Sequence, residues 1–436
     1  MKTSSFSRTI ELLKIASKVG LKEALSGNLK SRIDQAIIIA EGLSNLKGAA
    51  MKAGQLLSLE LADYFPKEAV DIISKLNSSA SFLDFETIEQ IIKNELGVNK
   101  FKLIDNIDTK PIGSASIGQV HKADYQGVPV AIKIQYPNIA NSIESDLKIL
   151  KRIAKSFCTL TGRNMDLTPL FSEFNYILSQ EVNYHKEAEL QMRYYKCINE
   201  INLPSKIKYT VPKVIEEMST AKIITMTWQN GVPLKEWIEK NNSLVNRETV
   251  AHGFLNLYFN ELFSWGLVQT DPNYGNFLIN ELEDCIEIVL LDFGATKEYS
   301  VNFINNYITL LNLVSKDDKK SLYSHAINFE IIDQRESAEA FEALYHVLKV
   351  AVRPFFAQNG DQDSYFFFDF SDKEHNKNSN QAAKELSKKL KYSPPPYNLI
   401  FLHRKLAGVY SILKKLGVTI NVSNYWQDML NNDKNS

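Results

Sequence analysis

Asp271-Pro272-Asn273-Tyr274-Gly275-Asn276 and Leu291-Asp292-Phe293-Gly294 are the two segments of this sequence that decide its fold. The first places an aspartate and an asparagine five positions apart in a loop-like segment that contains glycine. The second places another aspartate two positions before a glycine, about twenty residues later. Oxygen ligands on two such loops suit a hard cation that keeps waters and substrate phosphates as its other ligands. Together the two segments predict a site for ATP and Mg²⁺.

The spacing of these segments is that of the catalytic and metal-binding loops of the protein-kinase fold. In that arrangement Asp271 is the candidate to accept or orient the hydroxyl proton of a phosphoryl acceptor. Asn276 and Asp292 are the candidate ligands of Mg²⁺. The tripeptide D-F-G alone arises by chance and carries little weight. Joined to D-x-x-x-x-N and to a V-A-I-K segment, it becomes a strong signal.

That V-A-I-K segment is Val130-Ala131-Ile132-Lys133-Ile134, and it holds the candidate phosphate-binding lysine. Side chains alternate along a strand, so Lys133 faces away from the β-branched residues. A strand lysine is most often a solvated edge residue, but the downstream loops favour contact with the α- and β-phosphates. Such a lysine needs a carboxylate to direct it, and we predict an ion pair with Glu187. Glu181 and Glu189 are alternatives, and a surface glutamate in a charged helix is the simpler interpretation of each.

A loop that covers the phosphates is predicted in residues 111–119, about twenty residues before the lysine. Small side chains allow backbone N–H groups to approach phosphate oxygens closely. Taken alone, a G-S-A-S run is more often an ordinary turn. The candidate nucleotide contacts are the small residues of this loop and two residues of the strand-like run 222–228: Gly113, Ser114, Ala115, Ser116, Met226 and Trp228.

The order of predicted elements supports an α+β fold of the two-lobed protein-kinase-like type with an all-helical N-terminal extension. That extension is predicted at residues 1–97, the N-lobe at 98–230 and the mostly helical C-lobe at 231–436. A polar, mobile insertion is predicted around 361–396, before a last helix from Tyr397 to Leu416 that Gly417 ends. The other predicted elements are strands at 102–107, 116–125, 128–136, 211–216 and 222–228, and helices at 139–157 and 170–200.

Composition sets limits on the class of this 436-residue chain. A hydrophobic fraction of 44% supplies ample core, and a formal charge of −1 gives no electrostatic argument for nucleic acid. Three cysteines without C-x-x-C spacing favour a reducing compartment over disulfides or structural zinc. No stretch approaches the roughly 18 apolar residues that span a bilayer, so we do not expect an integral membrane protein. Residues 5–25 and Phe366-Phe367-Phe368 are candidate membrane contacts, although core packing is the simpler interpretation of both.

Taken together, these residues resemble the ADCK/UbiB family of atypical kinase-like proteins, and most closely its coenzyme Q biosynthesis branch. The resemblance covers nearly the whole chain. It rests on segments that match the family's motifs by position, from the K-x-G-Q motif through the alanine-rich nucleotide loop and the E-x-D motif to the C-terminal region: Lys52-Ala53-Gly54-Gln55, Gly113-Ser114-Ala115-Ser116, Glu181-Val182-Asn183, Gln269-Thr270-Asp271-Pro272-Asn273, Leu290-Leu291-Asp292-Phe293-Gly294-Ala295-Thr296, Pro394-Pro395-Pro396 and Leu402-His403-Arg404-Lys405.

The resemblance implies that the helix bearing Lys52 and Gln55 lies across the active site. Lys52 would then pair with Glu181, and the helix would hinder access by large protein substrates. Lys52 and Gln55 share one helix face beside a surface of glycine and alanine, which also suits simple packing of one helix on another.

Two departures from the family's pattern bear on regulation. Gly113 and Ser114 stand where alanines are usual, which bears on nucleotide preference and on inhibition of autophosphorylation. Asn183 replaces the aspartate of the E-x-D motif, and an asparagine keeps a hydrogen bond but not the charge.

The leading hypothesis is an ATP-binding, Mg²⁺-dependent atypical kinase or ATPase. The resemblance implies support of ubiquinone biosynthesis, by action on or extraction of lipid-like intermediates at a membrane surface. The implied partners are nucleotide, anionic lipid, and quinone-pathway enzymes or prenylated phenols, with no nucleic acid. The alternative is a pseudokinase-like scaffold or chaperone without phosphotransfer. A protein Ser/Thr kinase is less favoured, because Gln269-Thr270 stands where His-Arg is usual and no A-P-E follows the D-F-G. About fifty residues precede the K-x-G-Q motif, so we expect a bacterial-type cytoplasmic protein peripherally associated with the membrane.

Overall fold

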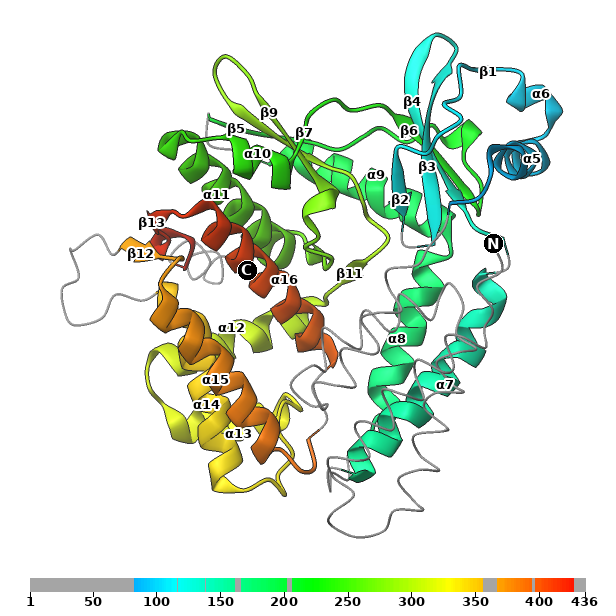
Figure 1. Ribbon diagram of the computed structural model, residues 1–436. Coiled ribbons are helices and arrows are strands. Elements are labelled where there is room, and N and C mark those ends of the chain that lie inside the picture. Colours follow the sequence, from blue (N-terminus) through cyan, green and yellow to red (C-terminus); the bar gives the residue numbers. More distant parts are fainter. Residues whose placement is uncertain are drawn as a thin grey trace, which may run out of the picture.

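A computed structural model describes residues 82–115, 117–137, 139–160, 166–201, 206–355, 367–393 and 397–426 (Figure 1). Within this part of the chain, no helix combines the length and the apolar character that a membrane span requires. Some predicted features lie outside the described residues: the segment 5–25, Lys52, Gln55, Ser116, Phe366 and Pro394-Pro395-Pro396.

An antiparallel sheet of five strands, here called the N-terminal sheet, has β3 and β4 at its centre (Figure 1). Gln126 and Gly127 join these two strands, with φ values of 51° and 79° that suit a two-residue hairpin turn. This is the turn that the sequence predicted. The strands and the two helices before them are α5 (Phe85–Leu96), α6 (Val98–Phe101), β1 (Ile104–Asp105), β2 (Gly113–Ala115), β3 (Gly118–Tyr125), β4 (Val128–Gln135) and β6 (Ile223–Thr227).

The two faces of β4 contact different parts of the molecule. Val130, Ile132 and Ile134 are buried in a core cluster with the apolar residues of α5. The opposite face carries Lys133, as the alternation of side chains along the strand predicted. The sheet therefore fixes the direction of the lysine by burying its neighbours on the other side.

The helix predicted at 170–200 is in fact two helices, α8 (Thr168–Glu181) and α9 (Tyr184–Glu200), which follow α7 (Ile139–Leu160). The break has a local cause at Val182 and Asn183. The Asn183 side chain accepts a hydrogen bond from the Lys186 N–H and so caps α9, while Gln135 Nε2 donates to the Val182 carbonyl at 2.8 Å. In Figure 1, α7 and α8 run side by side below the N-terminal sheet.

The strand predicted at 211–216 is wrong, because residues there form only an isolated bridge between Val214 and Met226. Pro212 has no N–H to give to a ladder. The strand lies earlier, in β5 (Ile207–Thr210), and pairs in parallel with β10 of a second, four-stranded sheet, here called the C-terminal sheet. Its remaining strands, and a separate two-stranded pair, are β7 (Val232–Pro233), β9 (Phe277–Glu281), β10 (Ile286–Leu290), β8 (Leu267–Gln269) and β11 (Thr296–Glu298).

Helices pack against the C-terminal sheet, most of them below it in Figure 1, and share its hydrophobic core. The predicted last helix is confirmed as α16, and Gly417 adopts a φ of 64° immediately after it. The other elements are η3 (Glu216–Met218), α10 (Leu234–Lys240), α11 (Leu244–Phe259), the π-helix η4 (Asn260–Ser264), η5 (Tyr274–Asn276), α12 (Val301–Ser315), α13 (Lys319–Asn328), α14 (Ala338–Val352), η6 (Arg353–Phe355), β12 (Phe367–Asp369), α15 (Lys373–Lys389), α16 (Tyr397–Leu416) and β13 (Thr419–Asn421).

The described part of the polar insertion predicted around 361–396, residues 367–393, contains a strand and a long helix, where its composition predicted a mobile segment. Helix α15 lies within it and packs against α14, because His375 and Ala382 form a buried stripe at helical spacing. Phe368 is buried in the core, whereas Phe367 is 59% exposed. One of the phenylalanines considered for membrane contact is therefore a core residue, as the simpler interpretation had it.

Candidate active site

Lys133 lies in a charged cluster between the N-terminal sheet and α9. Its Nζ atom is 2.6 Å from Glu187 Oε1 and 3.5 Å from Asp292 Oδ1. Glu187 reaches it from the first turn of α9, and Asp292 from the loop after β10. The predicted ion pair between Lys133 and Glu187 is therefore present, and Asp292 is a second carboxylate beside the same ammonium group.

Burial controls the protonation of this cluster. Burial, offset only in part by Lys133, raises the pKa of the Glu187 carboxyl to about 7. Burial by itself would lower the pKa of Lys133, but the carboxylates of Asp292 and Glu187 outweigh it and hold that pKa well above its usual value. The Tyr184 ring lies under the ammonium group at 5.2 Å. The fully ionised cluster has two carboxylates and one ammonium group, which makes it attractive to a cation.

A row of paired residues across the N-terminal sheet connects the predicted phosphate loop to the lysine. Gly113 in β2 is paired with Val120 in β3, and Val120 is paired with Lys133 in β4. Gly118, near the turn of this hairpin, is required by close packing, because a Cβ there would lie 2.2 Å from the Ile134 carbonyl oxygen. The hairpin therefore approaches β4 as closely as a backbone can.

Met226 and Trp228 follow the same side of the sheet as the lysine. Met226 in β6 is paired with Ala131, two positions from Lys133 along β4. The N–H of Trp228 donates to the Pro129 carbonyl at 3.0 Å, one step further along the strand pair. Period-two alternation puts all of these side chains on the face that carries Lys133. Both predicted nucleotide contacts thus lie on the sheet face that carries Lys133.

The loop from Asp271 to Asn276 lies against the D-F-G loop. Asn276 Nδ2 donates to the Asp271 carbonyl at 3.1 Å, and the Leu291 N–H donates to the Asn276 carbonyl at 3.0 Å. Arg404 Nη2 donates to Asp271 Oδ1 at 3.1 Å. The two segments singled out by spacing are therefore in direct contact, and an arginine from α16 contacts the first of them at Asp271.

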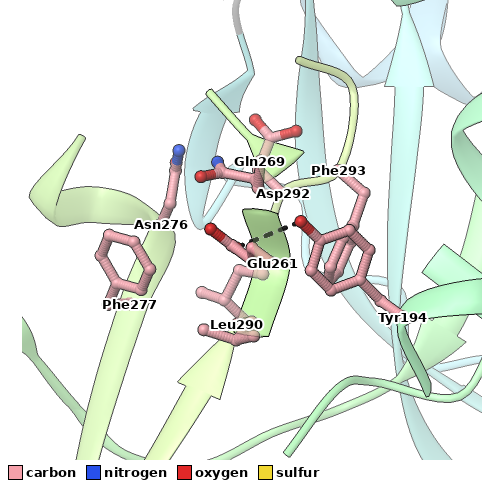
Figure 2. A pocket seen from close by; sticks show the side chains of 9 residues that line it. Tyr194, Glu261, Gln269, Asn276, Phe277, Leu290, Asp292 and Phe293 are labelled. Atoms are coloured by element: carbon pink, nitrogen blue, oxygen red, sulfur yellow. Dashed lines mark hydrogen bonds between the residues drawn. The ribbon is translucent and has the colours of Figure 1, made fainter. Parts of the chain in front are cut away.

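Asn276 and Asp292 come from the two adjoining loops and lie at the edge of a cavity of about 10 Å³, which is too small for a hydrated cation (Figure 2). Since Asn276 uses its Nδ2 group on Asp271, its carbonyl oxygen is the end that can face a ligand. One carboxylate and one amide oxygen, completed by waters and phosphates, are a donor set that fits Mg²⁺.

Comparison with known proteins identifies the family of this chain. The family model of the ABC1 atypical kinase-like domain matches residues 75–326. The chain belongs to the ABC1 atypical kinase-like family. "Probable serine/threonine-protein kinase abkA" of Dictyostelium discoideum is 31% identical over 396 residues, which cover 88% of this chain and 68% of that protein. "Atypical kinase COQ8, mitochondrial" of Saccharomyces cerevisiae is 29% identical over 425 residues, which cover 95% of this chain and 81% of that protein.

These relatives confirm the predicted membership of the ADCK/UbiB family and its coenzyme Q branch. A solved complex of Rv3197 with erythromycin from Mycobacterium tuberculosis matches this chain with a TM-score of 0.58 and 23% identity. It covers 89% of this chain and 93% of the Rv3197 chain. The kinase-like fold of mixed helices and sheets is thereby confirmed.

The two polar residues of the E-x-D segment of this ABC1-family chain lie in different environments. Glu181 is buried at the end of α8, close enough for its charge to act on the Glu187 carboxyl. Asn183 is exposed and caps α9, a position that asparagine fills about as well as aspartate. The replacement of the family's aspartate therefore leaves the local fold intact.

Sequence reasoning assigned no function to the residues of α16 that touch the ABC1 catalytic loop. Besides Arg404, Gly408 packs against Pro272 so closely that a Cβ would lie 2.0 Å from the proline Cβ. The two residues are four apart and share one helix face. The four-residue spacing of Arg404 and Gly408 in the predicted last helix was the only signal in the sequence. It did not indicate which segment this helix face would contact.

Proposed function

We propose that this ABC1-family chain binds Mg·ATP at the Lys133 cluster and catalyses phosphoryl transfer or ATP hydrolysis there. The observation that supports this most is the position of Lys133 Nζ between Glu187 at 2.6 Å and Asp292 at 3.5 Å. Phosphoryl transfer needs such a lysine, held by a carboxylate and adjoining a metal loop. A lysine kept only for stability has no need of two buried or half-buried carboxylates.

In this proposal each element contributes one function. Lys133 holds the α- and β-phosphates, and Glu187 keeps its ammonium group in place. The backbone of β2, at Gly113, Ser114 and Ala115, covers the phosphates with N–H groups.

The catalytic loop contributes the remaining groups. Asp271 orients the hydroxyl of the acceptor, or a water, in line with the transferred phosphoryl group. Asn276 and Asp292 hold Mg²⁺, which when bound neutralises phosphate charge. Met226 and Trp228 border the nucleotide on the sheet face.

We further propose that this activity supports ubiquinone biosynthesis by acting on lipid-like intermediates at a membrane surface. The names of the COQ8 relatives and the membership of the coenzyme Q branch support this role. Prenylated phenols are insoluble in water, so a chain that acts on them should bind the membrane peripherally. The same proposal includes an ion pair between Glu181 and Lys52, which is carried by the same helix as Gln55.

Purified protein with Mg·ATP tests the proposal, in the presence and absence of anionic liposomes or a quinone-like phenol. Phosphate release and transfer of label are measured for wild type, Lys133→Ala and Asp271→Asn. Lys208→Ala is the matched control, because this strand lysine is 54% exposed and pairs with Glu287 at 2.6 Å on the surface. We expect both site variants to lose activity and the control to keep it.

The outcomes separate the hypotheses. Labelled lipid or phenol indicates a small-molecule kinase, and phosphate release without labelled product indicates an ATPase. Nucleotide binding without turnover would favour the scaffold without phosphotransfer. Failure of the wild-type chain to bind nucleotide with or without Mg²⁺ would refute the proposed site.

A further inference from the structure

The catalytic loop has no basic residue of its own. From Gln269 to Asn276 the sequence reads Gln-Thr-Asp-Pro-Asn-Tyr-Gly-Asn. Thr270 gives both its N–H and its hydroxyl to the Ala295 carbonyl, at 2.9 and 2.7 Å, which joins the chain before Asp271 to the chain after the D-F-G. The positive charge that faces Asp271 must therefore come from another part of the chain.

That charge is Arg404 of α16. Its Nη2 atom lies 3.1 Å from Asp271 Oδ1, and the two side chains are 9% and 12% exposed. A hydrogen bond between charged groups with so little water around them is stronger and more directional than a surface ion pair. Asn276 contacts the same aspartate from within the loop, at the carbonyl and more distantly at Oδ2. Asp271 is thus held from both sides.

Helix α16 is also anchored at two positions within one turn after Arg404. Lys405 Nζ lies 2.9 Å from Glu261 Oε2, and both side chains are almost fully buried. Tyr194 of α9 donates to the same glutamate at 3.1 Å, as the dashed line in Figure 2 shows. One turn after the arginine, Gly408 lies against the catalytic loop at Pro272. Breaking a buried pair is costly, so the helix cannot shift without loss of these contacts.

We propose that Arg404 is a positioning residue for the phosphoryl-transfer reaction, and that α16 is in this sense part of the active site. Arg404 fixes the Asp271 carboxylate in the orientation that receives the acceptor hydroxyl or water. This inference rests on the proposed function of Asp271. Because Arg404 contacts the carboxylate and lies on the catalytic-loop side of the site, its loss lowers kcat and leaves nucleotide affinity nearly unchanged.

The test compares Arg404→Ala and Arg404→Lys with Arg247→Ala. Arg247 is the matched control, because it donates to the Leu416 carbonyl at 2.8 Å and so anchors the C-terminal end of the same helix, away from the loop. We expect Arg404→Ala to lower kcat by about 100-fold, as a misplaced catalytic group does, with the Kd for Mg·ATP changed by less than about threefold. Arg404→Lys should retain part of the rate, since it keeps the charge but not the planar fork.

Added guanidinium gives a measurement that a purely structural role would not affect. We expect it to restore kcat of Arg404→Ala in a saturable way and to have no such effect on Arg247→Ala. An unchanged kcat in Arg404→Ala overturns the inference. So does a loss of kcat that follows the unfolded fraction and does not respond to guanidinium.

A second measurement keeps the inference testable if wild type shows no turnover, which would refute the proposed function itself. Amide hydrogen exchange of the segment 269–276 should increase in Arg404→Ala and not in Arg247→Ala. Equal exchange of this segment in wild type and Arg404→Ala would show that the arginine does not hold the loop, whatever the activity of the chain.

Discussion

Replacing Glu187 by glutamine should change how the stability of the fold depends on pH. The Glu187 side chain is 2% exposed and faces Lys133 at 2.6 Å. Burial raises its pKa from the ordinary value of 4.5 to about 7. Glutamine has nearly the same shape but cannot ionise, so Glu187→Gln resembles the protonated form of the wild-type side chain at every pH.

The sign follows from proton uptake. Between pH 4.5 and about 7 the folded chain binds more protons at Glu187 than the unfolded chain does. The free energy of unfolding of wild type therefore falls as pH rises through this window, and this contribution is constant above about pH 7. The whole window corresponds to about 3 kcal/mol at about 1.4 kcal/mol per pH unit. Most of that change lies between about pH 5 and about pH 8.

Denaturant unfolding at about pH 5 and about pH 8 checks this, for wild type, Glu187→Gln and Glu189→Gln. Glu189 is the matched control, because it lies on the same helix, is 53% exposed and pairs with Lys186 on the surface. The stability of wild type relative to Glu187→Gln should fall by about 2 to 3 kcal/mol from the lower to the higher pH. For a chain of this length, that is an apparent Tm difference of about 3 °C. An equal difference at both pH values, or a gain of wild type over Glu187→Gln at high pH, would refute the reasoning.

Three further predictions follow from close contacts and from a helix cap. Gly118→Ala should lower the free energy of unfolding by about 3 kcal/mol, because the added Cβ would lie 2.2 Å from the Ile134 carbonyl oxygen. The measurement is denaturant unfolding, and a variant as stable as wild type would contradict this prediction. Gly408→Ala should push Pro272 and the catalytic loop away, since its Cβ falls 2.0 Å from the proline Cβ. Phosphate release should then drop by about tenfold while nucleotide binding persists, and an unchanged rate would show that the loop tolerates the shift. Asn183→Ala should cost about 1 kcal/mol of stability by thermal unfolding, whereas Asn183→Asp should keep the cap of α9; equal losses in both would exclude capping as the cause.

Much of the fold could be predicted because its signals are local. The turn at Gln126 and Gly127 and the last helix, ended by Gly417, were both visible in the sequence. The errors arose where partners distant in the chain decide the outcome. β5 at Ile207–Thr210 exists because β10, which lies far along the chain, pairs with it. The break before α9 depends on a cap and on Gln135, and hydrophobic periodicity detects neither.

The same division holds for the candidate site. The spacing of the motifs was enough to predict that Asp271 and Asn276 lie next to the D-F-G, because short loops between paired strands allow few other arrangements. Alternation along β4 predicted the direction of Lys133, and the partner Glu187 followed from its place on the next suitable helix. Arg404 was not predicted, because its contact with Asp271 joins residues 133 positions apart in the sequence. No sequence spacing encodes such a contact.

The charges of the site are held by partners from different elements, and this has a consequence for control of activity. Lys133 of the N-terminal sheet depends on Glu187 of α9, whereas Asp271 of the catalytic loop depends on Arg404 of α16. The two helices are themselves connected, since Tyr194 of α9 donates to the glutamate that Lys405 of α16 binds. Ion pairs weaken steeply when a charge moves by even one or two ångströms in surroundings with little water. A ligand, lipid or helix that shifts either α9 or α16 should therefore disturb Lys133 and Asp271 together, so the two parts of the proposed site are expected to respond as one unit.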